Sequence, residues 1–74
     1  LYKEALPFLE QAAISIPYNP VINNHLGDVY WALGRKLEAK YQWQKALDNY
    51  NDDISSEISL EDLKMKSSEG MDLE

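Results

Sequence analysis

Few side chains in this sequence could do chemistry, and they are poorly matched to one another. His25 is the single histidine, and Asp28 follows it three residues later. A metal site would need further ligands, but the chain has no cysteine and Glu38 is distant in the sequence. The serines have no second base and no glycine-rich elbow, and no phosphate-binding loop occurs. The sequence therefore predicts no catalytic residue, no metal and no cofactor, and we expect the chain not to be an enzyme.

The net charge of −6 is unevenly distributed along the chain. Residues 1–47 carry four acidic and five basic side chains, whereas residues 48–74 carry nine acidic and two basic ones. Because the chain lacks the clustered lysines and arginines that contact phosphates, we expect no nucleic-acid partner. No apolar run approaches the roughly 18 residues that span a bilayer, so we expect no membrane partner. The lack of cysteine is compatible with a reducing cytoplasm, which is the expected location.

The first segment with the apolar spacing of an amphipathic helix covers residues 2–16. Pro7 would break a helix interior, so the helix is expected to begin only a few residues before it. Pro17 is expected to end the helix. The apolar positions are three and four residues apart: Tyr2, Ala5, Leu6, Leu9, Ala12, Ala13 and Ile16.

Two further helices are predicted at residues 20–33 and 37–50. Asn19 is a candidate N-cap with Pro20 in the first turn, and Gly34 is placed to end the helix in a left-handed conformation. The buried stripe of the first of these helices is predicted to be Ile22, Leu26, Val29, Tyr30 and Leu33. The buried residues of the second are predicted to be Leu37, Ala39, Trp43, Ala46 and Leu47.

The first predicted helix matches the third when it is moved forward by 34 residues. Small residues coincide with small ones and large residues with large ones. The matching pairs are Glu4 with Glu38, Ala5 with Ala39, Leu9 with Trp43, Ala12 with Ala46, and Ile16 with Tyr50. Such a period is typical of repeated pairs of helices, so residues 1–19 are interpreted as the second helix of a preceding repeat.

Small and large residues alternate at fixed offsets through the second and third predicted helices: Leu26, Gly27, Tyr30, Gly34, Ala39, Trp43 and Ala46. Small residues are needed where the two helices approach, and large ones where the gap between them widens. By these residues, 20–53 resembles one complete tetratricopeptide repeat, and the phrase HLGDVYWALGRKLEAKYQWQKAL is similar to the last repeat of a group of alphaproteobacterial proteins. Asn23 and Asn51 depart from the pattern, which usually has a large apolar residue and a proline there.

The predicted fold is all-α, made of antiparallel helix-turn-helix repeats in an α-solenoid fragment with a C-terminal capping helix. The capping helix is assigned to residues 54–67, with Ser59 and Asp62 as a capping box and apolar positions Ile54, Ile58, Leu60, Leu63 and Met65. Residues 68–74 are predicted to be a disordered acidic tail. The chain is interpreted as the C-terminal part of something longer.

The resemblance implies a non-catalytic scaffold that binds a peptide or helix of another protein on its concave face. Carried over residue by residue, that face would comprise Val21, Asn24, His25, Asp28, Trp31 and Ala32. The subgroup of the family that clamps a peptide carboxylate uses Lys, Arg and Asn there. Asp28 disfavours such a clamp, so an apolar or basic partner is expected. Trp31 could contact the partner or pack within the protein.

Two other functions stay open at this stage. The chain could be an oligomerisation or end-cap segment, with Tyr2, Leu6 and Leu9 pairing with a second copy. It could also be a substrate-recognition arm of a larger repeat-containing enzyme, such as a glycosyltransferase.

Overall fold

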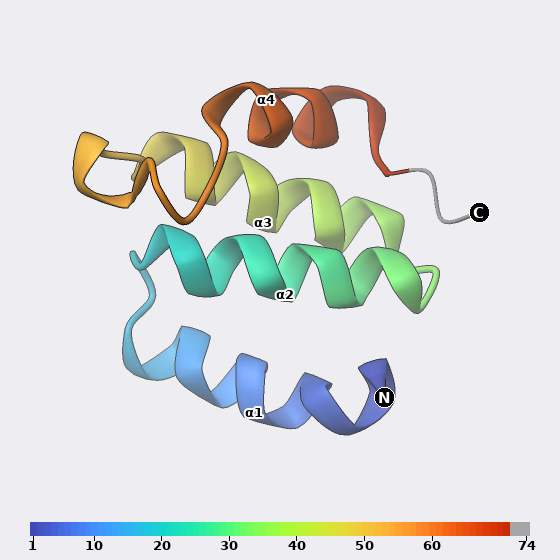
Figure 1. The fold of residues 1–74 in the computed structure, drawn as a ribbon. Coiled ribbons are helices and arrows are strands. Elements are labelled where there is room, and N and C mark those ends of the chain that lie inside the picture. The colour runs from blue at the N-terminus through green and yellow to red at the C-terminus, as the bar shows by residue number, and fades with distance from the viewer. Residues whose placement is uncertain (72–74) are drawn as a thin grey trace.

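The computed structural model describes residues 1–71, and these residues form four α-helices and one short 3-10 helix. The elements are α1 (Tyr2–Ser15), α2 (Pro20–Ala32), α3 (Lys36–Asp48), η1 (Asp52–Ile54) and α4 (Leu60–Glu69). The described part of the chain contains no strand, so the all-α prediction is confirmed. Successive helices run antiparallel, and α2 and α3 lie between α1 and α4 (Figure 1).

The start of α2 is fixed by a side chain, as predicted. The Asn19 side chain accepts hydrogen bonds from the backbone N–H groups of Val21 at 2.9 Å and Ile22 at 3.1 Å. Pro20 occupies the first helical position, where a missing N–H removes no intrahelical hydrogen bond. The residue at which α2 begins is therefore set by local hydrogen bonds and does not depend on a tertiary contact.

The end of α2 is also fixed locally. Gly34 has a φ of 83°, the left-handed conformation predicted for it. The N–H of Gly34 donates to the carbonyl of Trp31 at 3.0 Å, and the N–H of Arg35 donates to the carbonyl of Tyr30 at 2.8 Å. This pair of bonds is a Schellman motif, which satisfies carbonyls that the helix end would otherwise leave free.

The core forms where α3 packs between α2 and α4. Trp43 is fully buried and lies against Gly27, where a Cβ atom would come within 2.5 Å of the indole Nε1. The absence of a side chain at Gly27 therefore allows α2 and α3 to approach closely. The buried residues of this cluster are Leu26, Tyr30, Ala39, Trp43, Ala46, Ile58 and Leu63.

Four residues predicted to be buried are more exposed than expected. Leu37 is 86% exposed, because it lies in the first turn of α3 on a side that neither α2 nor α4 covers. Ile22, Leu33 and Leu47 are half-buried, at the edges of the stripes that Leu26, Val29 and Trp43 define. The predicted stripes were therefore too wide, because apolar spacing alone does not show where a neighbouring helix ends.

Pro7 lies in the second turn of α1 rather than in the first. The helix begins at Tyr2, and its first backbone bond joins the N–H of Ala5 to the carbonyl of Leu1 at 3.0 Å. Since proline has no N–H, the carbonyl of Lys3 has no donor four residues later. The helix nevertheless continues through Pro7 to Ser15.

The C-terminal helix differs from the prediction at both ends. It begins at Leu60 rather than at residue 54, because residues 52–54 form η1 and a turn follows. The Ser59 side chain accepts a hydrogen bond from the N–H of Asp62 at 3.2 Å, which confirms the predicted cap. The helix continues to Glu69, so the predicted disorder of residues 68 and 69 is wrong. Residues 72–74 of the predicted tail lie outside the described part.

Candidate interaction surface

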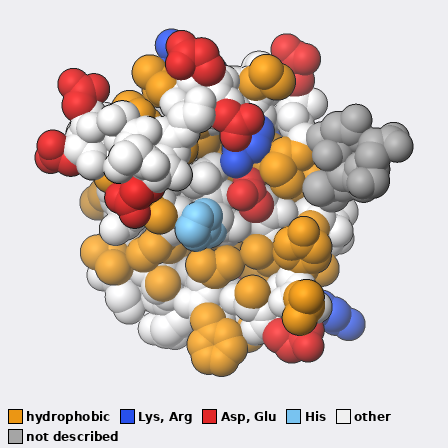
Figure 2. Space-filling view, in the orientation of Figure 1, with side chains coloured by type: hydrophobic (Ala, Val, Ile, Leu, Met, Phe, Trp, Pro, Cys, Tyr) orange, Lys and Arg blue, Asp and Glu red, His pale blue; other side chains and the backbone are white. Residues whose placement is uncertain are grey.

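The six predicted partner-binding residues do not form one open surface, because three of them contact the core or the C-terminal part of the chain. His25 is exposed, and Val21 and Ala32 are half-buried. Figure 2 shows this face, with the single histidine at its centre, charged side chains on the side of α4 and a band of hydrophobic side chains on the side of α1. The remaining three predicted residues are in contact with the C-terminal part of the chain.

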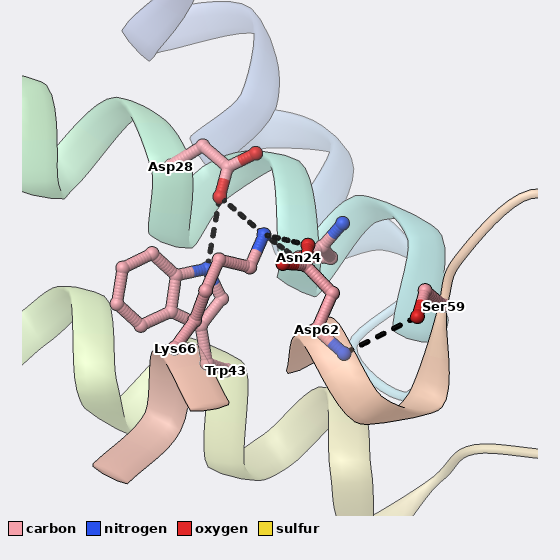
Figure 3. A network of polar contacts seen from close by, with 6 residues as sticks. All are labelled: Asn24, Asp28, Trp43, Ser59, Asp62 and Lys66. Carbon is pink, nitrogen blue, oxygen red and sulfur yellow. Dashed lines mark hydrogen bonds and ion pairs between the residues drawn. The ribbon is translucent and has the colours of Figure 1, made fainter. Parts of the chain in front are cut away.

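A buried lysine from α4 engages two of those three residues (Figure 3). Lys66 is 7% exposed, and its Nζ lies 2.7 Å from the Asn24 side-chain oxygen and 2.8 Å from Asp28 Oδ1. The same Asp28 oxygen accepts a hydrogen bond from the Trp43 indole N–H at 3.0 Å. Asp62 lies farther away, at 4.0 Å from the ammonium group. The charge of Lys66 is thus neutralised inside the fold rather than by solvent.

The sequence analysis missed the role of Lys66. A signal for it was present, because Lys66 lies three residues after Leu63 and therefore on the buried stripe of the same helix. A lysine on such a stripe needs a partner of opposite charge, since burying an unpaired ammonium group is costly. Nothing in the spacing of the sequence indicated that the partner would be Asp28.

Trp31 packs within the protein. Its ring centroid lies 5.6 Å from that of Trp43, and the Nζ of Lys36 lies 4.9 Å from the Trp31 ring centroid. On another side it meets the residues that follow α4, where a Cβ atom at Gly70 would overlap the Trp31 ring. Gly70 has a φ of 85°, so its lack of a side chain serves both the turn and this contact. Of the two roles considered for Trp31, the structure places it in intramolecular packing.

One exposed aromatic side chain of α1, Phe8, was not selected by the sequence analysis. Phe8 is 77% exposed, and Tyr2 is also exposed. Leu6 and Leu9, which were proposed with Tyr2 for self-association, are half-buried and pack against the core cluster. The exposed large apolar side chains of α1 are therefore Tyr2, Phe8 and Ile14 rather than Leu6 or Leu9.

A hollow of about 590 Å³ lies where the loop between α1 and α2 meets η1. It is lined by Val21 together with apolar residues on both sides of it. The lining residues are Ile16, Pro17, Tyr18, Asn19, Pro20, Val21, Ile22, Asn51, Ile54 and Glu57. The hollow therefore lies beside the N-terminal end of α2.

The opposite side of α2 carries a second polar cluster, built around Tyr30. Its hydroxyl donates a hydrogen bond to Glu10 at 2.7 Å and so joins α2 to α1. The guanidinium carbon of Arg35 lies 4.5 Å from the Tyr30 ring centroid, and the same side chain donates two hydrogen bonds to Glu38. The pKa of Tyr30 is raised to about 12, mainly because the phenol is buried and next because it donates the hydrogen bond to Glu10. The hydrogen bonds from Arg35 lower the pKa of Glu38.

Neither a metal-binding cluster nor a membrane-spanning helix occurs in the described part of the chain. Among residues 1–71, no group of three histidine, cysteine, aspartate or glutamate side chains could hold a metal ion. No helix in the same range is long and apolar enough to cross a membrane. Comparisons of the chain with protein-family models, with curated proteins and with solved structures find no match. The argument about function therefore depends on the surface itself.

Proposed function

We propose that this chain is a non-catalytic, protein-binding segment of a tetratricopeptide-type array, which holds a peptide or helix of another protein on the face shared by α1 and α2. The observation that carries the proposal is the band of hydrophobic side chains beside His25 (Figure 2). Aromatic and aliphatic side chains in such a band can act as anchors for a partner. The exposed His25 borders this band (Figure 2), and the half-buried Val21 and Ala32 belong to the same helix.

The packing between helices supports the resemblance to such an array. Gly27 of α2 lies against the Trp43 ring of α3, and the small residues Ala39 and Ala46 of α3 are fully buried in the same cluster. This arrangement of small and large residues is the physical reason for the repeat pattern. In this proposal, α4 is the terminal helix that shields the last hydrophobic surface of the array.

The proposed binding surface is smaller than the predicted one. Lys66 of α4 binds Asn24 and Asp28, and Gly70 lies against Trp31. Asn24 is buried by this contact, and Asp28 and Trp31 are partly covered. We therefore propose that a partner contacts the open residues of α2 and the neighbouring part of α1. An apolar partner segment is favoured over an acidic one, since Asp28 and Asp62 lie at the α4 border of the surface.

The test is a selection from a displayed library of helical and extended peptides with the full chain as bait. Selected peptides are then titrated against a double variant, His25→Arg with Ala32→Arg, and a control, Gln11→Arg with Gln44→Arg. Gln11 and Gln44 are exposed residues outside the predicted binding surface. We expect the first variant to weaken binding at least about tenfold, which corresponds to about 1.4 kcal/mol, and the control to bind like the wild type.

A chain that selects no peptide, or whose peptides bind both variants equally, would refute this function. Melting temperatures of the two variants are measured beside the titrations, so that a loss of binding is not confused with a loss of folding. A concentration-dependent association of the chain with itself would instead support the oligomerisation alternative.

A further inference from the structure

The hollow beside the start of α2 has two walls of different chemistry. One wall is residues 16–22, from the end of α1 into the first turn of α2, and it carries no charged side chain. The other wall is Asn51, Ile54 and Glu57, in and around η1. The two segments lie at the same end of the helices (Figure 1). An inference about this hollow rests on the proposed function only in taking the bound molecule to be a segment of a protein.

The first wall is apolar and partly open to solvent. Ile16 is 52% exposed and Tyr18 is 71% exposed, beside the half-buried Val21. The Asn19 side-chain oxygen is already engaged, because it accepts hydrogen bonds from backbone N–H groups at the start of α2. Covering exposed isoleucine and tyrosine side chains with an aliphatic group removes apolar surface from water. This wall therefore favours an apolar side chain of a partner.

The second wall belongs to an acidic part of the chain. Residues 48–63 hold six acidic side chains and no basic one. The Asn51 side-chain oxygen accepts a hydrogen bond from the N–H of Asp53 at 3.0 Å. The Glu57 carboxylate is exposed, and it forms no ion pair with any residue in the described part of the chain. A positively charged group of a partner would supply the missing counter-charge.

We propose that the hollow binds a short segment of a partner protein that packs an aliphatic side chain on Tyr18 and Val21 and pairs a lysine or arginine with Glu57. The apolar contact supplies most of the affinity, because an ion pair in an open hollow is screened by water. The charge supplies selectivity, because an acidic segment would be repelled. Lys45 does not reverse this preference: its Nζ lies 5.6 Å from the Tyr18 ring centroid, but the residue does not line the hollow.

The probe is a set of four arrays of short synthetic peptides in which two positions are fixed and the others are random neutral residues. The fixed apolar position holds leucine or serine, and the fixed charged position holds arginine or glutamate. The labelled full chain is applied at physiological ionic strength, where charges beyond about 8 Å are screened. We expect leucine to increase retention about tenfold over serine. Arginine should increase it about threefold over glutamate.

Two pairs of variants locate the bound peptides. Glu57→Lys should shift the preference from arginine to glutamate, whereas Glu61→Lys, the same change at an exposed residue outside the hollow, should keep it. Tyr18→Ser should lower the preference for leucine. Tyr41→Ser is its control, because Tyr41 is 63% exposed and does not line this hollow. Melting temperatures show whether each variant is folded.

The inference would be overturned by arrays that retain no chain, by equal retention on arginine and glutamate, or by equal effects of Glu57→Lys and Glu61→Lys. A dimer seen by sedimentation and lost in Glu57→Lys would assign the hollow to a second copy instead. If library peptides depend on His25 and Ala32 but not on Glu57, the proposed function stands and this inference fails. Peptides that depend on Glu57 and Tyr18 alone would support the inference and refute the proposed face.

Discussion

Lys66 connects three helices through one ammonium group. It contacts Asn24 and Asp28 of α2, and its Nζ lies 5.3 Å from the ring centroid of Trp43 in α3 (Figure 3). A buried ion pair gains little over an apolar contact of the same shape, but the loss of one partner leaves the other without compensation. The network therefore makes the position of α4 specific, because α4 must place one atom between two acceptors.

We expect Lys66→Met to destabilise the protein, because Asp28 and Asn24 each lose a hydrogen-bond donor. The Asp28 side chain is 34% exposed, so water replaces part of the lost interaction and the cost should be about 1–2 kcal/mol. Urea denaturation measures this free energy. Lys64→Met, at an exposed position of the same helix, is the control and should change stability little. Equal losses in the two variants would show that the network contributes nothing specific.

Tyr30 provides a pH-dependent contribution to stability. Its pKa is about 12 in the folded chain, above the ordinary value of 10.0, because burial and the bond to Glu10 favour the neutral phenol. The folded chain therefore holds this proton more tightly than the unfolded chain. The stabilisation is complete below pH 10 and is lost as the pH rises to about 12.

The expected loss from this group is on the order of 2 kcal/mol over that interval. Urea denaturation of the wild type and of Tyr30→Phe, carried through the same pH range, isolates it from the other tyrosines and lysines. The wild type should lose stability more steeply than the variant. Parallel curves would mean that the Tyr30 phenol has the same pKa in both states.

At the scale of elements, α4 depends on local caps at its two ends, Ser59 and Gly70, and on its tertiary contacts. Its N-cap is Ser59, and Leu63 and Lys66 are its buried residues. The other ordered segment before it, η1, is a single short turn capped by the Asn51 side chain. A ten-residue helix of this kind is too short to be stable alone in water, so its order is tied to docking on α3 and α2.

Ser59→Ala should cost about 1 kcal/mol, because the N–H of Asp62 loses its acceptor. Native-state hydrogen exchange should show the effect mainly in α4, with faster exchange at Leu63 and little change in α2. Ser56→Ala, in the exposed turn before the helix, is the control. A uniform increase in exchange across α2, α3 and α4 would instead indicate that the four helices open as one unit.

At the scale of the whole molecule, α2 and α3 are covered on two sides, whereas α1 and α4 are covered on one (Figure 1). This difference explains why Ala39 and Ala46 are fully buried while Ala5 and Ala12, their counterparts in α1, are not. Most acidic residues lie after α3. In α1, the exposed side chain of Phe8 lies one turn after the exposed carboxylate of Glu4.

The sequence by itself determined the helices and most of their ends. Three residues cap helix ends through backbone groups only a few residues away: Asn19, Gly34 and Ser59. Their effects can therefore be predicted from the sequence without knowledge of the tertiary structure. The sequence also predicted that small residues lie where the helices approach, and Gly27 does lie against the Trp43 ring, although that pairing itself was not predicted.

Only the tertiary structure decided where α4 lies and, with it, which part of α2 stays open. Lys66 and Asp28 are 38 residues apart, and no local spacing relates them. The assignment of Asn24, Asp28 and Trp31 to an open surface relied on the face of one helix, whereas their exposure depends on what another helix covers. The apolar spacing within one helix shows which residues share a face. Whether that face is buried depends on the neighbouring elements that pack against it.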